Sequence, residues 1–279
     1  IRELPALLMR AATPLDQPRA IGRAFISSKR RDERSAIDGL RQSGALRVLF
    51  PTRPKLVEAI VINTSGGVTG GDDFRVEAKA GAGSTLMLTT QAAERAYRAQ
   101  HGQTGQIETV LEADRDSTLF WLPQETILYD DANVRRQLRV SLAPTARFLM
   151  VEPILFGRRA MGEDTSQLHF HDRINIQRDG RPIYRDGITL SGAVATQLDR
   201  PAVADGARAL ASLVFVDPNA QAKLDAVRSH LGATGGASML QDDVMAMRLL
   251  AEDGFELRRA MLPILDLLTE NTLPQSWRL

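Results

Sequence analysis

The stretch "LVEAIVINTSGGVTGGDDFRVEAKA", from Leu56 to Ala80, decides the fold of this chain. Residues 56–63 and 74–80 alternate in part between apolar and polar side chains, which is typical of strands with one buried face. Between them, four glycines fill four of the six positions from Gly66 to Gly71, and Asp72 and Asp73 follow. Glycine supplies the positive φ angles of a tight corner, and an aspartate caps local backbone N–H groups. The stretch therefore predicts a strand–corner–strand unit.

A phosphate-binding loop is the main alternative for these glycines, and the flanking residues argue against it. A P-loop places Lys and Ser or Thr after its last glycine, whereas Asp72 and Asp73 would repel a phosphate. A dinucleotide loop leads into a helix, but the residues after Asp73 have the pattern of a strand. Glycine–aspartate calcium repeats work as stacks of many copies, and one copy is present here. We interpret the corner as architectural and predict no nucleotide binding.

The first two thirds of the chain continue the same strand pattern. Apolar and polar residues alternate in part in 84–90, 105–113, 117–123, 136–143, 146–152, 174–180 and 181–190. Gly, Asp, Asn or Pro separate these runs at intervals of about ten to fifteen residues, which predicts a mainly β body. Helices do not alternate with the strands, so a doubly wound α/β sheet is not expected.

After residue 220 the apolar residues recur at helical spacing. They form two sets: Leu240, Val244, Met247 and Ala251, and, after Gly254, Leu257, Met261, Ile264 and Leu268. Each set predicts an amphipathic helix with one apolar face. Pro263 should kink or shorten the second helix.

Composition narrows the classes of function. The 279 residues carry a net charge of +1, so no global field draws the protein to nucleic acid or anionic lipid. The chain has no cysteine, which excludes disulfides, thiolate metal sites and cysteine nucleophiles within it. Its apolar runs are too short for a membrane span, and its first ten residues do not resemble a signal peptide. We expect a cytoplasmic protein that binds neither nucleic acid nor membranes.

Three short blocks supply candidate polar site residues. In residues 88–98, Thr90 could cap a helical turn that places Glu94 and Arg98 on one face beside Tyr97. This block is either a polar lining or an exposed turn with one ion pair. The other two blocks hold Gln124 with Glu125, and Arg158 with Glu163. Glu125 is either a partly buried acid with a raised pKa or an acid that faces water or an arginine. Arg158 and Glu163 form either an internal network or partner contact, or a loop salt bridge.

Histidine offers a weak metal hypothesis. His169 and His171 are two residues apart, so on a strand both project to the same face and could hold nickel or zinc. No third histidine has a matching spacing, and no nucleophile motif is present. The residues give little support to an enzyme.

Several long blocks, in order, resemble one known family. They are "NTSGGVTGGD", "LTTQAAERAYR", "WLPQETILYDDA", "GRRAMGE", "MRLLAEDGFELRRAMLPIL" and the final "LPQSWRL". Together they are similar to the urease accessory protein UreD (UreH) family over about residues 20–279. The resemblance implies one UreD-type domain, with short strands stacked in a helix-like winding and a few helices, mostly C-terminal. We expect a β-rich body over about 20–220, a helical segment over about 221–270 and a tail over 271–279.

The resemblance also implies a function. Proteins of this family bind apo-urease and act with UreF and UreG, and indirectly with UreE, to insert nickel in a GTP-dependent process. No cofactor would be bound tightly, and nickel would pass in transit. The polar passage or partner contact would then use Glu94, Tyr97, Arg98, Gln124, Glu125, Arg158 and Glu163, and the C-terminal helices would contact UreF. The alternative is a β-helix-type polysaccharide hydrolase or lyase with paired carboxylates, for which the aromatic content of 5% is low.

Overall fold

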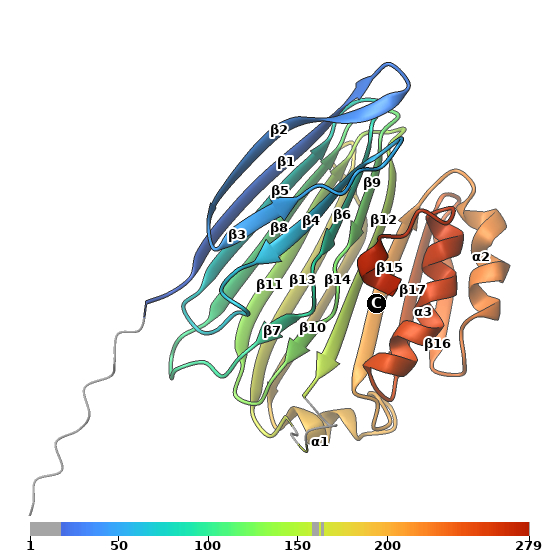
Figure 1. The fold of residues 1–279 in the computed structure, drawn as a ribbon. Coiled ribbons are helices and arrows are strands. Elements are labelled where there is room, and N and C mark those ends of the chain that lie inside the picture. The colour runs from blue at the N-terminus through green and yellow to red at the C-terminus, as the bar shows by residue number, and fades with distance from the viewer. Residues whose placement is uncertain (1–17, 158–161, 163–164, 279) are drawn as a thin grey trace, which may run out of the picture.

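The computed structural model describes residues 18–157, 162 and 165–278. Two β-sheets face each other, and helices α2 (Ala220–Ser229) and α3 (Gly254–Leu268) lie against one of them (Figure 1). A short helix, α1 (Val194–Leu198), follows the last strand of the other sheet. The mainly β class expected from the sequence is confirmed.

The two sheets have seven and ten strands in the described part of the chain. The seven-stranded sheet has the order β14 (Arg181–Gly192), β13 (Leu168–Arg178), β11 (Asn133–Leu142), β8 (Gly105–Ala113), β5 (Asp73–Ala80), β1 (Ile21–Arg31) and β2 (Arg34–Gly44). The ten-stranded sheet has the order β16 (Gly235–Gln241), β17 (Val244–Ala251), β15 (Ala209–Val216), β12 (Arg147–Phe156), β9 (Thr118–Leu122), β6 (Thr85–Thr90), β4 (Val57–Asn63) and β3 (Leu46–Leu49). Beside that path, β10 (Thr126–Leu128) pairs with β12 and with β7 (Glu94–Ala96).

The chain winds between the sheets. From β4 to β13, successive long strands alternate between the ten-stranded and the seven-stranded sheet, and neighbours within each sheet are parallel. Parallel neighbours need a crossover connection, which here is a strand of the opposite sheet. Antiparallel hairpins, β1–β2 and β13–β14, end the seven-stranded sheet. This arrangement confirms the stacked, helix-like winding.

The glycine corner carries the chain from one sheet to the other, because β4 ends at Asn63 and β5 begins at Asp73. The two Asp72 carboxylate oxygens accept hydrogen bonds from the backbone N–H groups of Ala20 and Thr69, both at 2.8 Å. Gly66 and Gly71 have φ angles of 82° and 89°. The predicted strand–corner–strand unit is therefore confirmed, and its aspartate binds the protein's own backbone.

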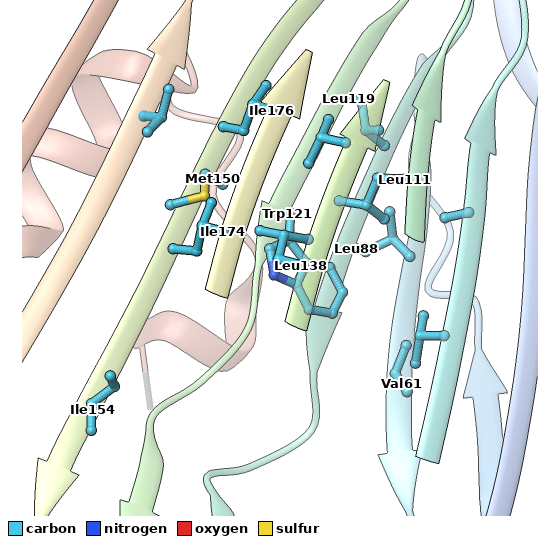
Figure 2. Packing of buried hydrophobic residues seen from close by; sticks show 14 of the residues in the cluster. Val61, Leu88, Leu111, Leu119, Trp121, Leu138, Met150, Ile154, Ile174 and Ile176 are labelled. Carbon is cyan, nitrogen blue, oxygen red and sulfur yellow. The ribbon is translucent and has the colours of Figure 1, made fainter. Parts of the chain in front are cut away.

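The main core lies between the sheets, where inward side chains of both meet (Figure 2). Strand β11 shows the pattern: Val134, Leu138 and Val140 are buried, whereas Arg135, Arg139 and Ser141 are exposed. Alternation of this kind buries one face of each strand and leaves the other in solvent. Strands β5, β8, β11 and β13 of the seven-stranded sheet follow this rule.

A second core covers the opposite face of the ten-stranded sheet. Apolar side chains of α2, α3 and Trp277 pack there against β12, β15 and β17. Every residue of β15 is buried, as expected for a strand covered on both faces. Trp277 lies in a short 3₁₀ helix, Gln275–Arg278, and donates from Nε1 to the Leu122 carbonyl at 2.9 Å.

The prediction of the first C-terminal helix is wrong. Residues 235–251 form strands β16 and β17, with Asp242 and Asp243 in the turn between them. The spacing was misleading because β17 is apolar on both faces, so its residues match helical and strand periods equally well. The second prediction is confirmed: α3 buries Leu257, Met261, Ile264 and Leu268, and it continues past Pro263.

None of the described helices is both long and apolar enough to span a membrane.

Candidate functional site: a polar pocket between the sheets

A pocket of about 250 Å³ enters the space between the two sheets. The exposed residues Gln91 and Ala92 line its outer part, next to Gly66 and Gly67 of the glycine corner. Its inner part reaches Trp121, Thr126, Arg136 and Glu152, which lie on β9, β10, β11 and β12. The winding thus lets polar side chains from several turns of the chain meet inside a β sandwich.

Glu94 lies in the wall of this pocket, where β7 begins. The side-chain nitrogen of Asn63 donates to its two carboxylate oxygens at 3.1 and 3.3 Å. Burial disfavours the charged form and raises the pKa of Glu94 to about 7, although the Asn63 hydrogen bond opposes this shift. Glu94 therefore changes its charge near neutral pH.

The predicted helical turn over residues 90–98 is wrong. Glu94 pairs with Thr126 in the β7–β10 ladder, and the Thr90 hydroxyl accepts from the Gln124 backbone N–H at 2.9 Å. Arg98 forms its ion pair with Asp131 at 3.0 Å instead of facing Glu94. Strand pairing between distant segments has overridden the local helical preference of this stretch.

Tyr97 and Arg98 are not among the residues that line the pocket. The Tyr97 hydroxyl donates to the Gly66 carbonyl at 3.3 Å, and its ring meets that of Tyr129 edge-on with centroids 5.1 Å apart. The Arg98 side chain is 72% exposed. Tyr97 therefore contacts the glycine corner, and the Arg98 side chain lies largely in solvent.

Gln124 and Glu125 tie the pocket wall to α3. The Arg258 guanidinium donates from Nη2 to Gln124 Oε1 at 2.6 Å and to Glu125 Oε1 at 2.7 Å, and its Nη1 donates to the Trp277 carbonyl at 3.0 Å. Of the two alternatives for Glu125, the structure shows the one in which it pairs with an arginine. Gln124 lines the pocket, and Glu125 does not.

The remaining predicted residues lie elsewhere. Arg158 and Glu163 fall outside the described residues. His169 and His171 lie on the outer face of β13, as their spacing predicted, with Nδ1 atoms 2.9 Å from the Ser191 hydroxyl and 3.2 Å from the Thr189 hydroxyl. Across the described ranges, no three His, Asp or Glu side chains gather closely enough to hold a metal ion.

A buried charged cluster at the inner end of the pocket was not predicted. Arg136 is 6% exposed, Glu152 5% and Asp172 3%. Arg136 Nη1 lies 2.6 Å from Glu152 Oε2, and its Nε and Nη2 donate to the two Asp172 oxygens at 3.0 and 2.8 Å. Trp121 Nε1 donates to the other Glu152 oxygen at 2.7 Å. Two carboxylates thus share one guanidinium inside the protein.

Burial raises the pKa of Glu152, and the nearby Asp172 charge adds to that shift, while Arg136 opposes it. The sequence does hold a signal for this cluster. Arg136 and Asp172 occupy positions where the alternation of β11 and β13 points inward, and Glu152 interrupts an apolar run in β12. A charged residue at an inward position is rare unless it is paired.

Fold and site together define a β protein wound between two sheets, with a charged pocket in its interior. The chain belongs to the UreD urease accessory protein family, which it matches over residues 20–278. It is 66% identical to the urease accessory protein UreD of Roseobacter denitrificans over 98% of this chain and 100% of that protein. The UreD proteins of Ruegeria sp. TM1040 and Agrobacterium fabrum are 53% and 41% identical, over 94% and 96% of this chain and 91% and 95% of their own lengths.

Proposed function

We propose that this protein is a scaffold chaperone that binds apo-urease and, with UreF and UreG, assists GTP-dependent nickel insertion. Its place in a family of urease accessory proteins supports the maturation role. In this proposal UreG hydrolyses GTP, UreE supplies nickel indirectly, and the chain itself has no catalytic centre and no tightly bound cofactor. The C-terminal helices are the proposed contact for UreF.

The observation that carries the proposal is the polar pocket between the sheets. Nickel in transit must be attracted and then released, so a few oxygen ligands suit a delivery path better than thiolates. Glu94 lies in the pocket wall and Glu152 in its inner part, and the chain has no cysteine. A pocket with carboxylates at two depths and no thiolate favours passage over storage.

A substitution that blocks the pocket tests whether nickel passes through it. Ala92 is exposed at the outer part of the pocket, so Ala92→Trp would fill the opening without disturbing the core. Ala92→Ser is the matched control, because it changes the same position and leaves the pocket open. The readouts are complex formation with UreF and apo-urease by size exclusion, and the nickel content of urease by elemental analysis.

We expect Ala92→Trp to form the complexes normally and to lower nickel loading at least fivefold, while Ala92→Ser behaves like the unmodified protein. Loading at the normal rate through Ala92→Trp would rule out this pocket as the route. A protein that binds neither apo-urease nor UreF would contradict the scaffold role itself.

A further inference from the structure

The outer face of the seven-stranded sheet carries an uneven distribution of charge. On β11, β13 and β14 the outward charged residues are Arg135, Arg139, Arg173 and Arg185, and His169 and His171 lie on the same face. Arg139 is paired with Glu108 of β8. No carboxylate projects outward from these three strands. The register places Arg135 beside His171 and Asn175 beside Arg185, so the arginines lie within a few strand spacings of about 5 Å.

The neighbouring strands of the same face differ, because their charges are already paired. Arg75 bonds to Glu77 and to Glu108, each at 2.5 Å, and Lys79 lies 3.2 Å from Asp114. In contrast, Arg135, Arg173 and Arg185 are exposed, and within the described ranges none of them has a carboxylate within 4.0 Å. The positive charge is therefore concentrated on the half of the face formed by β11, β13 and β14.

Arg173 is held in place across the neighbouring strand. A Cβ atom at Gly187 would come within 2.6 Å of Arg173 Nη1 and 3.1 Å of its Cδ, so the glycine leaves room for this side chain. Arg173 Nε also donates to His171 Nε2 at 3.2 Å. A guanidinium that is already positioned loses less conformational entropy when it binds a carboxylate.

The chemistry of this face fits an acidic protein surface better than a nucleic acid. Arginine is enriched at protein interfaces and binds carboxylates through two parallel hydrogen bonds. Proteins that bind single strands stack bases on aromatic side chains, and the outward positions of β11, β13 and β14 hold none. The net charge of +1 also gives no long-range pull on a duplex.

We propose that the outer face of β11, β13 and β14 is the docking surface for an acidic patch of apo-urease. This inference rests on the proposed function, in which the protein contacts apo-urease and UreF together. The helices assigned to UreF cover the ten-stranded sheet, on the opposite side of the sandwich (Figure 1). The two partners therefore bind opposite faces, and the pocket lies between those faces.

Charge reversal tests the surface. The triple variant Arg135→Glu, Arg173→Glu and Arg185→Glu changes only exposed side chains, so its thermal unfolding should match that of the unmodified protein. Binding of immobilised apo-urease is measured at 50 and 300 mM salt, with the full-length chain in complex with UreF. We expect at least tenfold weaker binding by the variant at low salt and a loss of most of the salt dependence.

The control is a second triple variant with the same change in charge, Arg31→Glu, Arg34→Glu and Arg115→Glu. These arginines are also exposed, and they lie at the β1–β2 turn and between β8 and β9. We expect this variant to bind apo-urease within threefold of the unmodified protein.

Equal binding by both variants and the unmodified protein would exclude this face while leaving the scaffold role intact. Equal weakening by both variants would mean that net charge, and not this face, drives the association, and would also overturn the assignment. No binding of apo-urease by the unmodified complex would contradict the proposed function together with this inference. Retention of duplex nucleic acid at 150 mM salt, lost only in the first variant, would replace the acidic protein with another class of partner.

Discussion

Replacement of Arg136 by Met should strongly destabilise the protein. The substitution keeps an unbranched chain in the core but removes the cation that Glu152 and Asp172 share. Loss of one partner from a buried ion pair costs about 3–5 kcal/mol, because an uncompensated charge stays behind. This loss is a large part of the roughly 5–15 kcal/mol that stabilises a typical protein. Because each kcal/mol lowers Tm by a few degrees in a chain of this size, we expect Tm to fall by about 5–15 °C.

Two comparisons separate this effect from a general loss of packing. Arg139→Met lies three residues further along β11 on the outer face, and we expect it to cost less than about 1 kcal/mol. Addition of Glu152→Gln and Asp172→Asn to Arg136→Met removes the unpaired charges and should recover at least half of the lost stability. The measurement is urea unfolding followed by circular dichroism.

The effect should also depend on pH. Without Arg136, the pKa of Glu152 in the folded state rises further above its unfolded value. A raised carboxyl pKa does not lower the free energy of unfolding at a pH where the group is protonated in both the folded and the unfolded state. The loss of stability grows as pH rises above about 4.5. The penalty of Arg136→Met should therefore be larger at pH 8 than at pH 5. A Tm within 2 °C of that of Arg139→Met at pH 8 would refute the reasoning.

Three further substitutions test other parts of the structure. Because the pKa of Glu94 is raised from 4.5 to about 7, Glu94→Gln should become progressively more stabilising as pH rises from 4.5 to 7, by about 3 kcal/mol in all. A pH-independent difference in unfolding free energy would contradict this. Arg258→Ala should cost about 2–3 kcal/mol and expose the C-terminus to limited proteolysis, whereas substitution of Arg259, whose side chain is 70% exposed, should not. Equal protection of the Arg258→Ala and Arg259→Ala variants would refute the proposed role of the Arg258 contacts. Gly67→Ala should lower stability by about 1–3 kcal/mol, because the added Cβ would lie 2.5 Å from a backbone carbonyl oxygen. Gly232→Ala is the control, because a Cβ atom at that position has open space around it. Equal Tm values for the two variants would argue against the close approach at Gly67.

Much of the fold could be predicted because its signals are local. Strands β5, β8, β11 and β13 each have one buried face and one exposed or half-buried face, so alternation identifies them, and the glycines of residues 66–71 mark the crossing between sheets. The secondary-structure predictions failed where a strand has no difference between a buried and an exposed face. Residues 235–251 have no single periodicity, because β17 is apolar on both faces, and β7 is three residues long and depends on pairing with β10.

The site was predicted less completely, because it is assembled from residues far apart in the sequence. Glu94 and Gln124 line the pocket, but the partner of Glu125 is Arg258, which follows it by more than a hundred residues. No local pattern shows such a pair. The Arg136 cluster, in contrast, was visible as charges at inward positions of three strands, and a search for broken alternation would have found it.

The Trp277 hydrogen bond to the Leu122 carbonyl has a consequence for synthesis on the ribosome. Each turn of the winding pairs with a turn made roughly 30 residues earlier, so the sandwich can grow while the chain emerges. The cover over the apolar face of β6, β9 and β12 comes from α2, α3 and Trp277, which leave the exit tunnel after those strands. A nascent chain that stalls before α3 therefore exposes the apolar face of the ten-stranded sheet. Chaperones and proteases would recognise that exposed apolar surface.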